Sequence, residues 1–192
     1  MIRRARVLLF AAAALSVAAP PEKPRPLGAA FLQAAQLEKP HLSRTAIAAL
    51  QAAFDTKILK VSASDPMDVL SSTQGVYLEG YGTVFTAQLD LIMTPAINPF
   101  RQEMSKAEIA RVRARKLERL PVLKLIMREM LVESAASLGA MPANEQVVLA
   151  VSLFRMRWED TAGLPAQIVM QAPRAKLLDR AAAQSAIQVQ EY

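Results

Sequence analysis

The first nineteen residues differ in composition from the rest of the chain and limit which residues can belong to a folded domain. Three arginines lie within the first six residues, and Val7–Val17 is an uncharged run of Val, Leu, Phe, Ala and one Ser. A basic start, a short apolar run and the small residues Ser16–Ala18 form the three-part pattern of a secretory signal peptide. The apolar run is about a dozen residues, shorter than the ~20 that a transmembrane helix needs. We therefore predict a signal peptide over residues 1–18 and a mature chain, without a transmembrane helix, that is periplasmic or extracellular.

The chain of 192 residues contains no cysteine and one histidine, His41, which excludes several kinds of chemistry. Without cysteine there is no disulfide framework, no thiolate metal site and no thiol nucleophile. A transition-metal site would need carboxylates for almost every ligand, and a Ser-His-Asp triad would have to use His41. We therefore expect no metal and no cofactor, and a fold that is stabilised by packing of its apolar side chains.

The charge of the mature chain is close to balanced. The formal net charge is +6 at pH 7, from 23 basic and 17 acidic residues. Three of the basic residues lie in the predicted signal peptide, so the mature chain carries 20 basic and 17 acidic residues, or +3. Because a nucleic-acid-binding domain has a larger basic excess, we do not expect nucleic acid as a partner.

A proline-rich leader precedes the predicted domain. Ala19–Gly28 contains four prolines in ten residues, a composition that favours an extended chain. A short helix could form over Ala29–Glu38. Residues 43–192 have helix and strand patterns along their whole length and suffice for one domain with its own core. We therefore predict a signal peptide over 1–18, a leader over 19–42 and one α+β domain over 43–192.

A long helix is predicted in the middle of the domain. Ser105 and Glu108 have the spacing of a capping box, so the helix should begin at Lys106, and its apolar pattern continues to about Leu138. Pro121 lies inside it and removes one backbone hydrogen bond, which predicts either a kink or two abutting helices. A second helix is predicted over residues 44–59, and shorter ones over 66–70 and 174–183.

Two predicted hairpins flank the long helix. Alternation of apolar and polar residues over Thr83–Ile92 is typical of a half-buried antiparallel strand. Hairpins separated by a helix build an antiparallel sheet covered by helices, here with three to five strands. The predicted strands are residues 76–79, 83–92, 145–158, 166–171 and an edge strand at 187–190.

Candidate binding residues gather around Gly80-Tyr81-Gly82, where the two glycines predict a bulge, a sharp bend or a tight hairpin. Tyr77 and Tyr81 could offer a flat amphipathic surface to a sugar or a peptide. Glu79 and Asp90 lie on opposite sides of these glycines and could face each other across a hairpin, where paired carboxylates could do acid–base work. The alternation places Asp90 on the polar face of its strand, which favours solvated charges over a catalytic pair.

A basic segment forms the first half of the long helix. Its cations alternate with apolar residues, which predicts one apolar stripe and a cationic outer face. Such a face is either simply solvated or attracted to anionic envelope material such as lipid head groups. The cations are Arg111, Arg113, Arg115, Lys116 and Arg119.

These patterns support three hypotheses. The first is an exported, non-enzymatic domain that binds a partner or envelope component through the hairpin or the basic helix. The second is a small metal-independent hydrolase or lyase that uses Glu79, Asp90, Tyr77 and Tyr81. The third is an assembly component, including a homo-oligomer, whose hairpin edge accepts a strand from a partner. A concave pocket that holds two carboxylates would favour the enzyme, and an open surface would favour binding.

Overall fold

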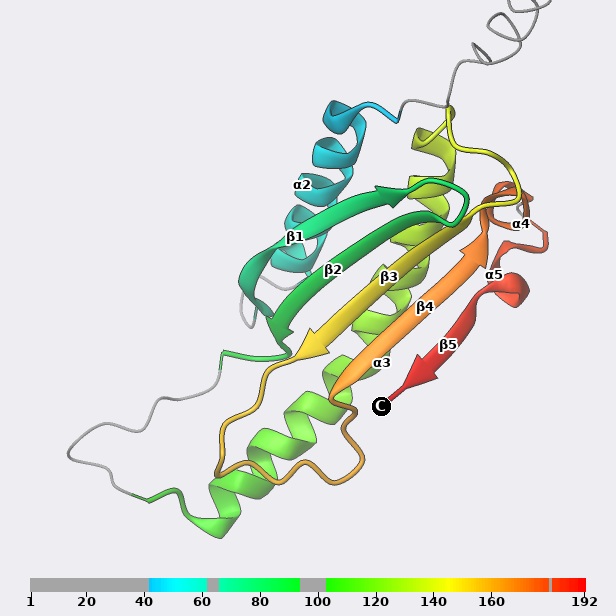
Figure 1. Ribbon diagram of the computed structural model, residues 1–192. Helices are drawn as coiled ribbons and strands as arrows, with labels where there is room; N and C mark the ends of the chain where they lie inside the picture. Colours follow the sequence, from blue (N-terminus) through cyan, green and yellow to red (C-terminus); the bar gives the residue numbers. More distant parts are fainter. Residues whose placement is uncertain (1–41, 62–65, 94–102, 180) are drawn as a thin grey trace, which may run out of the picture. The chain divides into compact units, whose positions relative to one another are not determined.

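Helices and strands follow one another as helix, hairpin, long helix, hairpin, two short helices and an edge strand (Figure 1). The computed structural model describes residues 42–61, 66–93, 103–179 and 181–192, all within one unit over residues 40–192. The predicted signal peptide and the leader up to and including His41 lie outside the described residues, whereas Leu42, the last residue of the predicted leader, packs against the core. The elements are α2 (Arg44–Lys60), β1 (Asp68–Leu78), β2 (Gly82–Asp90), α3 (Lys106–Ser137), β3 (Gln146–Leu153), β4 (Gln167–Pro173), α4 (Arg174–Leu178), α5 (Ala183–Ala186) and β5 (Gln188–Glu191).

The sheet has five strands in the order β1-β2-β3-β4-β5. Both predicted hairpins are present, because β1 pairs antiparallel with β2 and β3 pairs antiparallel with β4. The prediction of a purely antiparallel sheet is wrong, since β2 and β3 are parallel. Parallel neighbours need a crossover connection, and α3 provides it by returning the chain to the end of the sheet at which β2 starts. The domain is therefore α+β with a mixed sheet.

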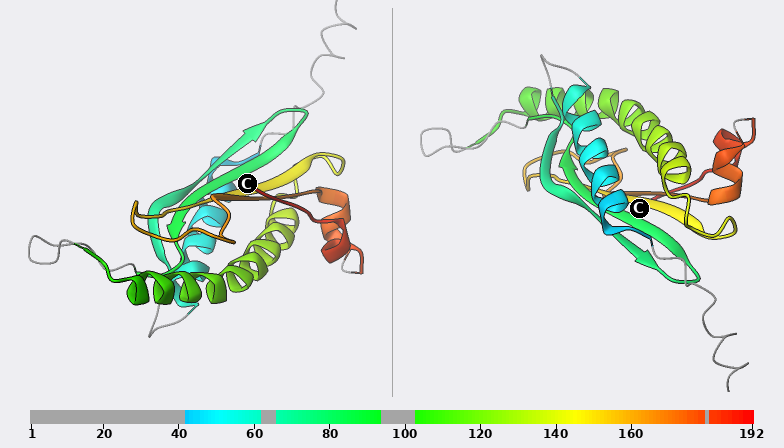
Figure 2. Two further views of the ribbon diagram at one scale, coloured as in Figure 1. Left: turned by 90° about the horizontal axis from the view of Figure 1, so that it is seen from below. Right: turned by 90° about the horizontal axis from the view of Figure 1, so that it is seen from above.

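Both long helices lie on the same face of the sheet (Figure 2). Phe54 and Ile58 of α2, and Met127 and Met130 of α3, are almost fully buried against it. Gly75 of β1 lies so close to α2 that an added Cβ would clash with the Ile47 side chain. The other face of the sheet carries no helix among the described residues. No helix in these segments is long and apolar enough to cross a lipid bilayer.

The long helix begins where the capping box predicts. The Ser105 Oγ accepts from the Glu108 N–H at 3.3 Å, and the Glu108 carboxylate accepts from the Ser105 N–H at 3.0 Å. α3 then continues through Pro121 as one helix rather than two abutting ones. Pro121 is exposed, so water can hydrogen-bond the carbonyl that the proline leaves without a backbone donor.

Several predicted boundaries were wrong. β1 already begins at Asp68, where the sequence predicted a short helix to residue 70 and then a loop. Register shifts between Val69 and Ser71 and between Ser71 and Gln74 interrupt this strand, and such bulges remove the period of two from the sequence. β3 ends at Leu153, five residues before the predicted end, and the predicted helix over 174–183 is only α4. The helix at 44–59 and the edge strand at 187–190 are confirmed as α2 and β5, within one residue.

Candidate functional site

The glycine hairpin is held to β3 by a buried carboxylate. The Tyr77 hydroxyl donates to Oε1 of Glu145 at 3.2 Å, and the Gly80 N–H donates to the same oxygen at 3.1 Å. Glu145 is 5% exposed and directly precedes β3. Burial and this contact with Glu145 raise the pKa of Tyr77 above its ordinary value of 10.0. Tyr77 therefore takes part in an internal contact, whereas Tyr81 and Glu79 are exposed at the turn.

Two glycines fix the shape of this turn. Gly80 has a φ of +81° and Gly82 a φ of +136°, a region that side chains with a Cβ rarely adopt. A Cβ on Gly80 would meet nothing, but a Cβ on Gly82 would overlap the backbone of Gln146 in β3. Gly82 is thus required by the close approach of β2 to β3, in addition to its own conformation.

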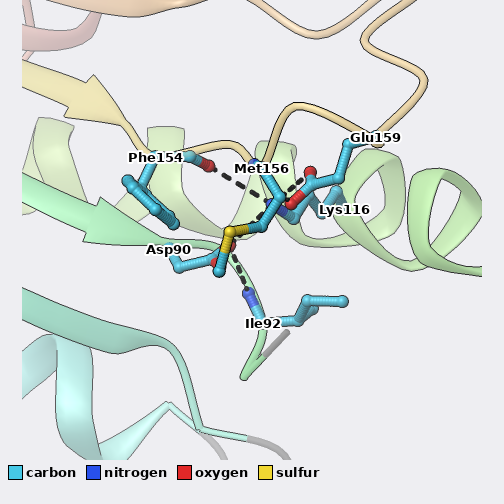
Figure 3. A network of polar contacts seen from close by, with 6 residues as sticks. All are labelled: Asp90, Ile92, Lys116, Phe154, Met156 and Glu159. Carbon is cyan, nitrogen blue, oxygen red and sulfur yellow. Dashed lines mark hydrogen bonds and ion pairs between the residues drawn. The ribbon is translucent and has the colours of Figure 1, made fainter. Parts of the chain in front are cut away.

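Asp90 is part of a buried ion cluster with Lys116 and Glu159 (Figure 3). The Lys116 Nζ lies 2.8 Å from Oδ1 of Asp90 and 2.6 Å from Oε2 of Glu159, and it donates to the Phe154 carbonyl at 3.2 Å. The side chains of Lys116, Asp90 and Glu159 are 3%, 5% and 1% exposed. Glu159 also accepts from the Met156 N–H at 3.0 Å. All three donors of Lys116 are therefore satisfied, and the cluster joins β2, α3 and the loop after β3.

The ion cluster corrects two expectations. Asp90 is buried instead of solvated, because it ends β2 where the loop after β3 covers the strand. Lys116 is buried instead of lying on a cationic outer face, because Val112, Lys116 and Leu120 are each four residues apart and all three are buried. The pocket beside the cluster has a volume of about 10 Å³, room for about one water molecule.

The remaining cations of the basic segment lie in different surroundings. Arg111 is exposed, and Arg113, Arg115 and Arg119 are half-buried. The Arg113 Nε donates to the Ala162 carbonyl at 2.8 Å and lies 3.6 Å from Oδ2 of Asp160. Arg113 thus ties α3 to the loop between β3 and β4.

The carboxylate pair considered for Glu79 and Asp90 does not form. Asp90 lies opposite Asp68 in the β1–β2 register, whereas Glu79 follows β1 at the other end of β2. The four residues proposed for acid–base chemistry therefore divide between the hairpin and the ion cluster. Among the described residues, no three His, Asp or Glu side chains are grouped so that they could hold a metal ion.

The sheet face opposite the helices, here named the open face, consists of three cross-strand rows of outward side chains. Each row follows from the strand register. None of these residues is charged. The first row is Val76, Val84, Val148, Gln171 and Gln188, the second is Gln74, Thr86, Ala150, Val169 and Gln190, and the third is Ser71, Gln88, Ser152 and Gln167.

A shallow groove of about 320 Å³ lies on the open face over β1, β2 and β3. It lies at the bulged part of β1, where the strand departs from regular pairing. Apart from Ala87, its lining residues carry hydroxyl or amide groups, which can both donate and accept hydrogen bonds. They are Ser71, Gln74, Thr86, Gln88 and Ser152.

Comparisons with known proteins give no relative: no family model, no curated protein and no solved structure matches the chain.

Sequence reasoning missed the groove, Glu145 and the buried role of Lys116. The alternation in Thr83–Ile92 did predict that Val84, Thr86 and Gln88 share a face, but not that this face stays uncovered. The four-residue spacing of Val112, Lys116 and Leu120 was a signal for the burial of Lys116. Glu145 had no local signal, because its contacts with Tyr77 and Gly80 join distant parts of the chain.

Proposed function

We propose that this chain is an exported domain that acts by binding a partner through the open face, not by catalysis. The observation that carries the proposal is the groove of about 320 Å³ on an uncharged sheet face. A volume of this size lies at the lower end of the range for small-ligand sites. The groove therefore suits a neutral, polar surface or segment.

The distribution of titratable groups supports binding over acid–base chemistry. General acid–base catalysis needs an ionisable side chain within hydrogen-bond reach of the substrate. The groove lining contains only hydroxyl, amide and methyl groups. Asp90, by contrast, is engaged in the ion cluster, beside a pocket of about 10 Å³. Neither the groove nor this small pocket thus brings a substrate-sized space together with a free carboxylate, which favours binding over the hydrolase or lyase hypothesis.

Site-specific photo-crosslinking in cells tests the binding surface. A photoreactive amino acid is placed at Thr86, which is exposed in the groove, and at Leu125, which is 56% exposed on α3 and serves as the matched control. We expect a covalent adduct of defined mass from position 86 and none of that mass from position 125. The absence of an adduct at position 86, in cells that contain the folded protein, would contradict the proposal.

Export is tested separately by the N-terminus of the protein recovered from cells. Cleavage after Ala18 would remove the basic and apolar segment, as the small residues Ser16–Ala18 predict. Sequencing of the mature protein should therefore start at Ala19. An intact Met1 on the protein in a cytosolic fraction would contradict export.

We propose a second contact, with anionic envelope surfaces, at the first half of α3. Arg111, Arg115 and Arg119 recur every fourth residue, so they follow one side of the helix. Arg111 is exposed at the start of this series. Lipid head groups with negative charge would be attracted to this side at low ionic strength.

A further inference from the structure

We infer that the partner of the open face is a second copy of this chain, packed face to face in a two-fold dimer. This inference rests on the proposed function, because it names the occupant of the same face. Three observations carry it: the lack of charge on the open face, the chemistry of its side chains and its area.

The open face is uncharged, while the helical side of the domain is densely charged. On the helical side, for example, Lys57 of α2 pairs with Glu129 and Glu133 of α3. Burial of charges in an interface carries a large desolvation cost, which the three rows of the open face avoid. A two-fold contact also brings the same surface of both copies together. A charged face would then repel its own copy, whereas this face does not.

The side chains of the open face are complementary to themselves. Gln amides carry both donors and an acceptor, so the glutamines of one copy can pair with those of the other. Near the centre of the face, the cross-strand neighbours Thr86, Ala150 and Val169 are small or β-branched. Such residues allow two sheets to approach to the usual distance of ~10 Å.

The area of the open face is sufficient for a reversible dimer. Its 14 outward side chains lie on strands about 4.8 Å apart and are spaced about 6.6 Å along each strand, so they cover roughly 450 Å² per copy. A dimer would bury roughly 900 Å² in total, an area in the range of weak, transient interfaces. A small polar ligand would fill the groove but leave Val76, which is 51% exposed, uncovered, whereas a second sheet covers all three rows. We therefore expect a dimer that depends on protein concentration.

Analytical ultracentrifugation of the mature chain tests the dimer. The wild type should shift from monomer to dimer between about 1 μM and about 1 mM. Ala150→Lys places a charge near the centre of the face and should keep the chain monomeric over this range. Leu125→Lys places the same charge on the exposed side of α3 and should dimerise like the wild type.

Ala150 is half-buried, so its replacement could prevent folding. Thr86→Lys provides a second variant, since the Thr86 side chain is already exposed, and circular dichroism checks that both variants are folded. A wild type that stays monomeric up to about 1 mM overturns the inference. Equal dimerisation of the wild type and of folded Ala150→Lys and Thr86→Lys also overturns it, because the contact would then use another surface.

The absence of cysteine from the chain allows a direct test of the geometry. Sheets packed face to face are ~10 Å apart, too far for a disulfide, which needs Cα atoms within about 7 Å. A short bismaleimide should therefore crosslink Ala150→Cys into a dimer but leave Leu125→Cys as monomer. Equal crosslinking of the two variants would contradict the face-to-face arrangement.

The photo-adduct at position 86 separates this inference from the proposed function. An adduct of two copies of the chain supports both. An adduct with a different molecule, together with a monomeric chain in the centrifuge, retains the binding function and overturns the dimer. No adduct and no dimer overturns both.

Discussion

Replacement of Lys116 by methionine tests whether the ion cluster depends on its cation. The change removes the ammonium group but keeps a long apolar side chain within α3. Asp90 and Glu159 would then be two carboxylates with side chains 5% and 1% exposed that have lost the Lys116 ammonium group. Removal of one partner from a buried ion pair costs about 3–5 kcal/mol. We therefore expect the free energy of unfolding of Lys116→Met to fall by about that amount, and its Tm by roughly 10 °C.

Urea denaturation at pH 7, followed by far-UV circular dichroism, measures this loss. Arg111→Met is the matched control, because Arg111 lies on the same helix and is exposed; it should change the free energy by less than about 0.5 kcal/mol. The triple variant Lys116→Met, Asp90→Asn, Glu159→Gln leaves no charge in the ion cluster. It should recover most of the lost stability, because the cost arises from uncompensated charges and not from the absence of the ion cluster.

A loss below about 1 kcal/mol in Lys116→Met would refute this reasoning, since the two carboxylates would then not need the ammonium group. A triple variant no more stable than Lys116→Met would also count against it. The fluorescence of Trp158, which lies in the loop next to Glu159, reports whether the loop detaches before the domain unfolds.

Three further predictions concern the hairpin and the basic helix. Gly82→Ala should destabilise the domain by more than about 3 kcal/mol in urea denaturation, because the new Cβ overlaps β3. Gly80→Ala is strained only by its positive φ and should cost about 1 kcal/mol. Equal losses in the two variants would contradict the close approach at Gly82. Because the pKa of Tyr77 is raised in the folded protein, the unfolded chain loses the hydroxyl proton at a lower pH than the folded protein does. The contribution of Tyr77 to the free energy of unfolding is therefore complete below about pH 10 and is lost as the pH rises through the folded pKa. Above pH 10, the free energy of unfolding of Tyr77→Phe should therefore fall less steeply with pH than that of the wild type. Parallel curves for the two proteins would show that Tyr77 does not cause the fall. Binding to anionic liposomes, measured by co-sedimentation at low and high ionic strength, should be sensitive to salt. It should be lost when four arginines are changed to glutamine: Arg111, Arg113, Arg115 and Arg119. A wild type that does not bind at low salt would exclude this contact.

Elements with local signals could be predicted from the sequence. Ser43 and Ser105 mark the starts of α2 and α3, because a capping side chain contacts its own first turn. The alternation after Gly82 predicted β2, because a strand with one buried face has a period of two. These signals arise within a few residues, and no tertiary contact changes them.

Features that depend on distant contacts could not be predicted. The parallel pairing of β2 and β3 depends on the direction in which α3 returns the chain, and no residue of either strand encodes it. The early start of β1 was hidden by its bulges. Lys116 is an intermediate case. Its four-residue spacing from Val112 and Leu120 places it in the apolar stripe, but a lysine is expected at the surface unless acidic partners lie beside it. Those partners, Asp90 and Glu159, come from distant parts of the chain.

The residues of the candidate site show the same difference between local signals and distant contacts. The sequence placed Tyr77, Glu79 and Tyr81 together at the hairpin, because they are neighbours in the chain. It could not show that Glu145 holds Tyr77, or that Asp90 belongs to an ion cluster at the other end of β2. The uncharged open face was visible only in part, since its composition emerges when the registers of five strands are known.

The parallel pairing of β2 with β3 also affects the order in which the domain can assemble. The segment before α3 contains the hairpin of β1 and β2, and the segment after α3 contains β3 and β4, which are joined by residues 154–166. Both pairs join strands that are closer in sequence than β2 and β3 are, so both can form early. The seam between them closes only when α3 has folded and returned the chain along the sheet. We therefore expect the backbone amides of this seam to gain protection from hydrogen exchange last during refolding, although they lie at the centre of the finished sheet.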